Sequence, residues 1–347
     1  MDGERGPIGG LEILPVHGIG DVMPGDDLAA LIVGAAPWLR DGDILVVTSK
    51  IVSKAEGRLV EVPADGPERE AARADVLAAE TARVVARRGP TAIVQTHHGF
   101  VMAAAGIDAS NIDKTHLVLL PADPDASARA LRAALAGRGL DVAVIVSDTM
   151  GRAWRNGLTD VALGAAGIAP VRDHRGEIDP YGNELQLTEM AVIDELAAAG
   201  ELVKGKCAQV PVAVVRGFPG TGIADGPGAA ALVRDPDSDM FSLGTAEARA
   251  AGLRDAARLA DAPAGGVPAD PAAVARALAA VEDMLAPGTH VGESAGVLRF
   301  AAPDASPAAL LRLGADVHRV RAALAAEGLG STAVPDGAAL TLTLTRA

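Results

Sequence analysis

Aromatic residues and cysteine are scarce in this chain of 347 residues. Phe, Trp and Tyr together make up only 2% of it. Because RNA-binding proteins stack bases on aromatic rings, this composition disfavours sequence-specific RNA recognition. The single cysteine, Cys207, rules out a disulfide within the chain and fits a cytoplasmic location. We expect its side chain to be a small apolar group in the core.

Basic charge and long apolar runs are scarce as well. The chain has 31 Lys and Arg against 45 Asp and Glu, which gives a net charge of −14. A groove that follows a phosphate backbone should be basic, so we expect no nucleic-acid partner, although a metal ion can still mediate contact with a nucleotide. The first ten residues lack an apolar signal segment, and no apolar run reaches the roughly 20 residues that span a bilayer. The sequence thus predicts a soluble protein with no membrane partner.

Hydrophobic residues make up 49% of the chain, which is enough for a substantial core. The length predicts two domains. Composition changes along the chain predict four parts: a flexible tail (1–10), a large first domain (11–260), a Pro- and Gly-rich linker (261–268) and a small C-terminal α/β domain (269–347). Because strand and helix patterns are mixed, we predict the α+β class.

Hydrophobic periodicity and turn residues predict the individual elements. Strands are expected at 11–16, 44–48, 92–95, 99–104, 142–146, 210–215, 296–301 and 339–345. Helices are expected at 28–39, 67–88, 126–136, 188–199, 245–260, 270–285 and 306–327. Asp26 and Asp27 precede the first of these helices and are good N-cap residues.

The densest cluster of polar residues follows the apolar run 142–146. Asp148 and Thr149 place two hard oxygen ligands side by side there, and Arg152 and Arg155 add forked donors for phosphate or carboxylate. Such a set suits a divalent metal that carries a phosphorylated ligand. The alternative is an ordinary Asp-Thr turn followed by two solvated arginines.

Two other apolar runs also end in polar residues, at Ser49 to Lys54 and near Asp108 and Asn111. Strand ends in α/β sheets gather ligand groups, so Asp108 and Asp148 are candidates to share one divalent cation, with Thr149 on a second. Each aspartate taken alone also fits a turn.

No standard nucleotide loop is present. Residues 200–207 come within one residue of a Walker A motif, but a helix precedes them, a strand is expected to follow, and the last position is Cys207. A Walker A loop must instead leave a strand and open a helix. A nucleotide would therefore need a site built from a metal and scattered loops.

Six blocks occur in an order and spacing that resemble the coenzyme F420-0:γ-glutamyl ligase family. They are ILPVHGIGDVMPGDDL, DGDILVVTSKIVSKAEGR, AAAGIDASN, SDTMGRAWRNG, DPYGNEL and PVAVVRGF, and the resemblance spans about residues 11–260. It implies the family's α+β fold, an intertwined homodimer, and a GTP-dependent ligase that adds L-glutamate to coenzyme F420-0 and extends the γ-linked tail. It also implies an acyl-phosphate intermediate and two Mg²⁺ or Mn²⁺ ions, with K⁺ as a possible addition.

The resemblance also suggests roles for individual residues. Asp108 and Asp148 match ligands of the first cation, and Thr149 matches a ligand of the second. The GTP contacts that it implies are Ile19, Gly20, Asp21, Val22, Ser49, Lys54 and Asn111. Arg152 and Arg155 are the candidates for binding substrate carboxylate or phosphate. The segment with Gly205 and Lys206 matches a later nucleotide segment, but Lys206 is left out of the metal ligands because archaeal members carry a different side chain near it.

The chain departs from the two-domain relatives after residue 268. Those relatives carry a flavin-binding, nitroreductase-like domain there, whereas the 79 residues that remain are too few for a domain of roughly 200. FMN binding is therefore not expected. Two alternatives to the F420 ligase stay open: a GTP-dependent amide ligase for another phosphorylated carboxylate, and a non-catalytic deazaflavin-binding protein.

Overall fold

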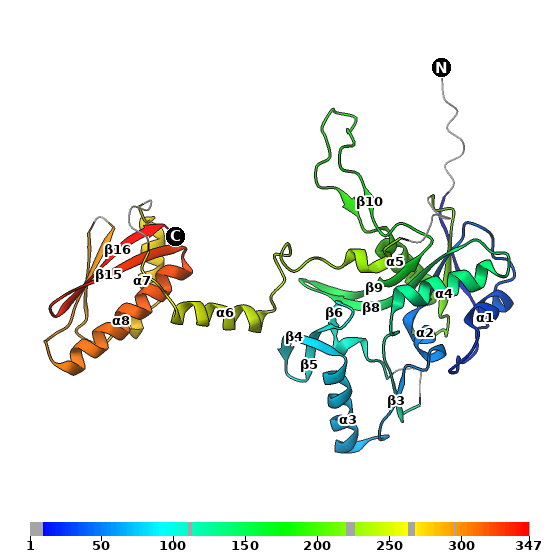
Figure 1. Ribbon diagram of the computed structural model, residues 1–347, viewed down its shortest axis with the longest axis horizontal. Coiled ribbons are helices and arrows are strands. Elements are labelled where there is room, and N and C mark those ends of the chain that lie inside the picture. Colours follow the sequence, from blue (N-terminus) through cyan, green and yellow to red (C-terminus); the bar gives the residue numbers. More distant parts are fainter. Residues whose placement is uncertain (1–9, 110–112, 220–225, 263–267, 295, 347) are drawn as a thin grey trace. The chain divides into compact units, whose positions relative to one another are not determined.

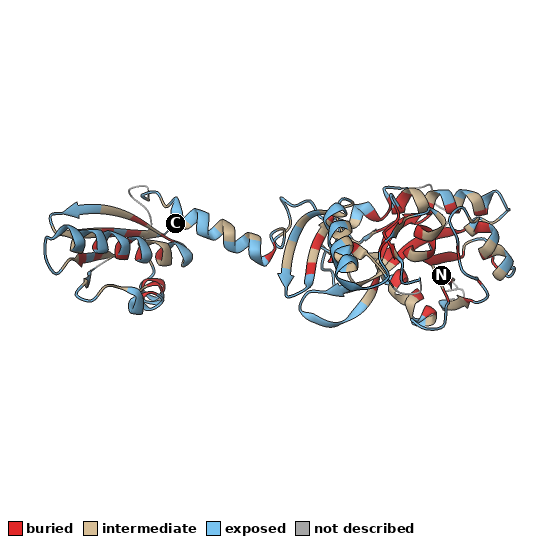
Figure 2. Ribbon diagram, turned by 90° about the horizontal axis from the view of Figure 1, so that it is seen from below, coloured by how far each residue is buried: buried red, intermediate tan, exposed pale blue. Residues whose placement is uncertain are grey.

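The computed structural model describes residues 10–109, 113–219, 226–262, 268–294 and 296–346. The chain forms two compact units, Met1–Ala246 and Glu247–Ala347 (Figure 1). This division comes earlier than the expected domain boundary at residue 260. Helix α6 (Thr245–Ala257) lies across it and buries none of its residues, so the helix belongs to neither core (Figure 2). Most of the expected linker, residues 263–267, lies outside the described residues.

The centre of unit 1 is a five-stranded sheet of order β1-β12-β2-β8-β9. Its strands are β1 (Glu12–Val16), β12 (Val212–Arg216), β2 (Ile44–Thr48), β8 (Ala143–Arg152) and β9 (Arg155–Ala166). Strands β2 and β8 pair in parallel, with Thr48 opposite Ser147, and the other neighbours are antiparallel. The polar residues that follow β2 and those near the middle of β8 are therefore brought to the same edge of the sheet.

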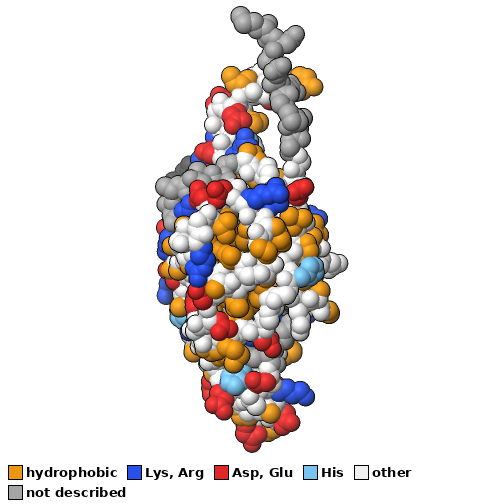
Figure 3. Space-filling model, turned by 90° about the vertical axis from the view of Figure 1, so that its right-hand side faces the viewer, with side chains coloured by type: hydrophobic (Ala, Val, Ile, Leu, Met, Phe, Trp, Pro, Cys, Tyr) orange, Lys and Arg blue, Asp and Glu red, His pale blue; other side chains and the backbone are white. Residues whose placement is uncertain are grey.

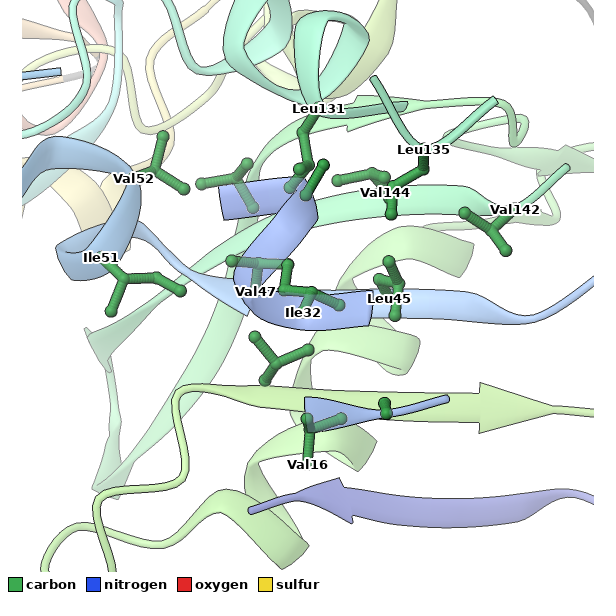
Figure 4. Close-up of a cluster of buried hydrophobic side chains, with 14 of the residues drawn as sticks. Val16, Ile32, Leu45, Val47, Ile51, Val52, Leu131, Leu135, Val142 and Val144 are labelled. Atoms are coloured by element: carbon green, nitrogen blue, oxygen red, sulfur yellow. The ribbon is translucent and has the colours of Figure 1, made fainter. Parts of the chain in front are cut away.

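Alternating side chains of this sheet fill two hydrophobic cores. On one face, Leu45, Val47 and Val144 pack against helices α1 (Leu28–Ala35), α2 (Ser49–Ala55) and α4 (Pro124–Ala136) (Figure 4). On the other, Ile44 and Ile145 pack against α5 (Val192–Lys204). Strand β2 is apolar on both faces because helices cover both. Asp27 caps α1 as predicted, accepting a hydrogen bond from the Ala30 amide.

Smaller elements complete unit 1. They are β3 (Leu59–Glu61), α3 (Gly66–Ala79), β4 (Thr81–Arg88), β5 (Thr91–Thr96), β6 (Val101–Ala103), β7 (His116–Val118), β10 (Arg172–Asp173), β11 (Glu189–Met190) and the short 3₁₀ helices η1 (Ala104–Gly106) and η2 (Gly228–Leu232). The segment between β9 and α5, which includes β10 and β11, extends away from the sheet (Figure 1).

Two expectations about local structure were wrong. The helix expected at 67–88 ends at Ala79, and 81–88 form a strand because this stretch pairs with β5 along its whole length. The helix expected from Thr188 begins at Val192, because Glu189 and Met190 pair with Arg172 and Asp173.

Unit 2 is a four-stranded antiparallel sheet of order β13-β14-β16-β15 with two helices. Its elements are α7 (Pro271–Ala279), η3 (Glu282–Met284), β13 (His290–Ser294), β14 (Val297–Ala301), α8 (Pro307–Ala326), β15 (Leu329–Asp336) and β16 (Ala339–Arg346). Both helices contribute to one core around Phe300 and Leu342. Strands β13 and β15 were not predicted. With mixed sheets and helices in both units, the α+β class is confirmed.

The surface agrees with the acidic composition. On the face drawn in Figure 3, Lys and Arg side chains are scattered among those of Asp and Glu. Within the described ranges, no helix is long and apolar enough to cross a membrane.

Candidate active site

A cavity of about 730 Å³ lies in unit 1 where β2 and β8 bring their polar residues together. We call it the β2–β8 cavity. The loop 19–22, helix α2, the chain from Met102 to Asp108, the β8–β9 hairpin and residues 201–211 contribute its walls. Three predicted metal ligands, Asp108, Asp148 and Thr149, all line it. Residues about 40 positions apart in the sequence thus meet at one site.

Two carboxylates, Asp108 and Asp148, give one side of the cavity negative charge. Burial raises the pKa of the Asp148 carboxyl to about 6, and the charges of Asp160 and Asp108 add to this effect. The Thr149 amide and Lys50 act against it. Lys50 Nζ lies 2.6 Å from Asp108 Oδ2. An ionised carboxylate held against two others is a place where a cation is strongly favoured.

A buried ion pair supports the opposite side. Asp160, on β9, is 3% exposed, and Lys204, at the end of α5, is 2% exposed. Lys204 Nζ donates to Asp160 Oδ2 at 3.0 Å and to Ser147 Oγ at 2.9 Å, and Ser147 Oγ also donates to Asp160. Burial alone would raise the pKa of Asp160, but the Lys204 charge and the hydrogen bond from Thr149 outweigh it and lower that pKa.

Lys206 approaches the same carboxylate from the cavity. Its Nζ donates to Thr149 Oγ1 at 2.6 Å and lies 3.8 Å from Asp160 Oδ1. It also pairs with Glu201 Oε1 at 2.5 Å. Thr149 Oγ1 in turn donates to Asp160 Oδ1 at 2.7 Å. Thr149 therefore belongs to a charged network that is complete without a metal ion.

The glycine loop and helix α2 form the remaining wall. Ile19, Gly20, Asp21 and Val22 all line the cavity, as does Lys54 from α2. Lys54 Nζ lies 3.9 Å from Asp21 Oδ1. An ammonium group beside the backbone of a cavity-lining loop is an arrangement that can attract phosphate.

Comparison with known proteins connects this geometry to a family. A model of the family described as F420-0:Gamma-glutamyl ligase matches residues 18–217, which is more than half of the chain. The chain belongs to this family.

Curated relatives agree with this assignment. The chain is 39% identical over 249 residues to "Coenzyme F420:L-glutamate ligase" of Methanothermobacter thermautotrophicus, covering 67% of this chain and 99% of the relative. The protein of the same name from Methanopyrus kandleri is 40% identical, covering 67% of this chain and 97% of the relative. That from Haloarcula marismortui is 41% identical, covering 66% of this chain and 95% of the relative. As a member of the F420-0:gamma-glutamyl ligase family, the chain is an enzyme of the ligase class.

Most residues that the family resemblance singled out lie at the cavity, but not all. Ser49 is buried at the start of α2 and does not line the cavity. Asn111 lies outside the described residues. Arg152 and Arg155 lie at the tip of the β8–β9 hairpin, because β8 continues past Asp148 as a paired strand. Both arginines are exposed, outside the cavity lining, so the structure does not bring them together with the carboxylates.

Sequence reasoning missed several charged residues of the site. Asp160 directly precedes the apolar stretch 161–168, which contains no acidic residue of its own. A lone acidic residue beside such a stretch is the signal that could have drawn attention to it. Glu201 and Lys204 belong to the segment that was rejected as a Walker A loop; the rejection was sound, since α5 precedes Gly205. Cys207 is exposed, so the expectation of a buried cysteine was wrong.

The first-cation site expected for this family suits the residues present. Among the described residues, no three or more His, Cys, Asp and Glu side chains gather in a way that could hold a metal ion. Mg²⁺ does not need such a set, because it is commonly bound by one or two carboxylates together with substrate phosphates and water. Asp108 and Asp148 supply two carboxylates in one cavity, and their mutual repulsion is the chemistry that a cation relieves.

Proposed function

We propose that this chain uses GTP to join L-glutamate to coenzyme F420-0 and then extends a γ-linked glutamate tail. Family membership and relatives named Coenzyme F420:L-glutamate ligase support the glutamate and F420 parts of this proposal. The observation that carries the rest is that Asp108 and Asp148 line one cavity together with Lys50, Lys54 and Lys206. Carboxylates for a metal ion beside ammonium groups for phosphates are what a polyphosphate-dependent reaction requires.

The proposed chemistry has two steps. An oxygen of the acceptor carboxylate attacks the γ-phosphorus of GTP, the bond from that phosphorus to the GDP oxygen breaks, and an acyl phosphate forms. The amine of glutamate then attacks the acyl carbon, phosphate leaves with the bonding electron pair, and the amine proton passes to solvent. Phosphate is needed as leaving group because an unmodified carboxylate is a poor acyl donor.

Residues of the cavity suit particular tasks in these steps. Lys50, Lys54 and Lys206 line the cavity and provide positive charge for the triphosphate. Loop 19–22 offers backbone amides to the nucleotide. Asp108 and Asp148 would hold Mg²⁺ or Mn²⁺, which neutralises and aligns the phosphates. The expected K⁺ remains a prediction to which we assign no residue.

We also propose that the active form is a homodimer. The segment between β9 and α5 extends from unit 1 and carries Ile178, Tyr181 and Leu187, which are 72%, 91% and 92% exposed. Large apolar side chains on an extended segment are typical of a surface that a partner covers. Light scattering on the purified protein should give twice the chain mass. Deleting residues 172–190 should give a monomer, whereas a dimeric deletion variant would show that another surface forms the interface.

Mass spectrometry of the product tests the function directly. The protein, GTP, Mg²⁺, L-glutamate and F420-0 should yield the acceptor plus one or more glutamate residues, with one GDP for each glutamate added. Asp148→Asn should abolish the mass increase while keeping the far-ultraviolet circular dichroism spectrum. GDP release only with other carboxylate acceptors would favour the broader amide ligase. Tight F420-0 binding with no GDP release would favour a binding protein.

A further inference from the structure

The hydroxyl of Thr149, expected to bind a second divalent cation, is already engaged by a lysine. It donates to Asp160 Oδ1 at 2.7 Å and accepts from Lys206 Nζ at 2.6 Å. The same ammonium group lies 2.5 Å from Glu201 Oε1 and 3.8 Å from Asp160 Oδ1. Lys206 Nζ therefore occupies the point on which the oxygens of Thr149, Glu201 and Asp160 converge. These are the hard oxygen donors that a divalent cation would use.

The local backbone explains why a lysine reaches this point. Helix α5 ends at Lys204, and Gly205 follows with φ 62° and ψ −175°, a conformation that side-chain-bearing residues rarely adopt. This turn sends two lysines to opposite oxygens of one carboxylate: Lys204 Nζ to Asp160 Oδ2 and Lys206 Nζ toward Asp160 Oδ1. Lys204 is buried, whereas Lys206 is 60% exposed and faces the cavity.

The balance of charge differs between the two sides of the cavity. Asp160 and Glu201 carry two negative charges that Lys204 and Lys206 match with two positive charges. Asp108 and Asp148 also carry two negative charges; Lys50 lies beside Asp108, and its charge acts on Asp148. The four charges of the first side balance without a metal ion, whereas the second side offers two carboxylates in one cavity that a divalent cation can bind.

We infer that this chain binds one divalent cation, at Asp108 and Asp148, and that the Lys206 ammonium takes the place of a second. The inference rests on the proposed use of a metal–nucleotide substrate and specifies how its charge is neutralised. A divalent ion at Thr149 would have to displace the ammonium, because two cations at hydrogen-bonding distance repel each other strongly at a partly buried site. Lys206 supplies one positive charge at this position as part of the chain, so no ion has to bind there.

Counting bound Mn²⁺ tests this inference independently of turnover. Free Mn²⁺ is measured by electron paramagnetic resonance at pH 7.5, with the full-length protein, with and without a β,γ-imido analogue of GTP, and with a protein-free nucleotide blank. We expect one Mn²⁺ per chain. Lys206→Gln replaces the ammonium by a carboxamide oxygen that can bind a metal, and we expect it to raise the count to two. Two ions about 4 Å apart would also broaden the spectrum through their mutual coupling.

Matched variants separate the possible outcomes. Lys206→Arg keeps the positive charge and should keep the count at one, and so should Lys114→Gln, which removes a lysine that does not line the cavity. Two Mn²⁺ in the unaltered protein would overturn the inference, and so would none. One Mn²⁺ in both the unaltered protein and Lys206→Gln would show that Lys206 does not exclude the second ion. Titration calorimetry with the GTP analogue reports nucleotide binding separately, so failure of the proposed GTP dependence is distinguishable.

Discussion

Asp148→Asn should stabilise the metal-free protein at neutral pH while it abolishes activity. In the folded chain, burial raises the pKa of Asp148 to about 6, and the charges of Asp160 and Asp108 add to the rise. An unfolded aspartate has a pKa near 3.9, so above pH 6 the ionised carboxyl destabilises the folded state by up to about 3 kcal/mol. Asparagine has the same shape and cannot ionise, so it removes this destabilisation.

The pH dependence follows from the direction of the shift. Well below pH 3.9 the carboxyl is protonated in both states and contributes nothing. Between about pH 4 and 6, Asp148 ionises in the unfolded chain before it ionises in the folded one. The free energy of unfolding of the unaltered protein therefore falls relative to that of Asp148→Asn as the pH rises. The difference between the two proteins should be about 0.5 kcal/mol at pH 4 and approach about 3 kcal/mol at pH 7.5.

Thermal unfolding in EDTA at pH 4 and pH 7.5 measures this difference. One kcal/mol corresponds to about 2–4 °C for a unit of this size, so Asp148→Asn should raise Tm at pH 7.5 by about 6 °C or more. Adding Mg²⁺ and the GTP analogue should reduce the gap, because ligand at 100 times its Kd stabilises the unaltered protein by about 2.7 kcal/mol. Asp173→Asn is the control, since a hydrogen bond from Arg175 lowers the pKa of Asp173 to about 2 and its replacement should not raise Tm. An unchanged or lower Tm for Asp148→Asn at pH 7.5 would refute the reasoning.

Three further predictions concern other parts of unit 1. Arg216→Ala should cost about 3 kcal/mol in urea unfolding, because Arg216 makes two 2.8 Å hydrogen bonds to the buried Asp43 carboxylate, which would lose its ion-pair partner. Gly164→Ala should destabilise by about 3 kcal/mol or more, since the new Cβ would lie 2.0 Å from the Pro124 carbonyl oxygen; Gly34→Ala, with no atom within 4 Å of its new Cβ, should be nearly neutral in the same assay. Replacing both hairpin-tip residues, Arg152→Ala and Arg155→Ala together, should leave the Kd for the GTP analogue within twofold, because neither lines the β2–β8 cavity; a tenfold rise in Kd would place the tip against the nucleotide.

Much of the sheet and part of the site could be predicted from local sequence. Continuous apolar runs such as Ile44–Thr48 are typical of strands buried on both faces, and both faces are covered. The rule that parallel strands deliver polar residues to one edge places Asp148 and the residues after β2 at one cavity, as observed. The roles suggested for the individual residues stay predictions.

What could not be predicted depends on pairing between distant segments. Met150 and Gly151 carry no strong strand signal, yet β8 continues through them because β9 pairs with it. That pairing moves Arg152 and Arg155 away from Asp148. The buried pair of Asp160 and Lys204 joins residues 44 positions apart, and its formation depends on α5 packing against β9. Neither residue has a local pattern that indicates its partner.

The position of β12 in the sheet determines when unit 1 can fold during synthesis. Strand β12 lies between β1 and β2, so β1 has no neighbour in the sheet until residues 212–216 have emerged from the ribosome. Before that point, the growing chain exposes an unpaired edge of β2, which is a surface prone to aggregation. The cavity residues on the earlier strands are all made before its last wall, which residues 201–211 supply. Nascent chains released early would therefore contain the aspartates of the site but lack the lysines that balance Asp160.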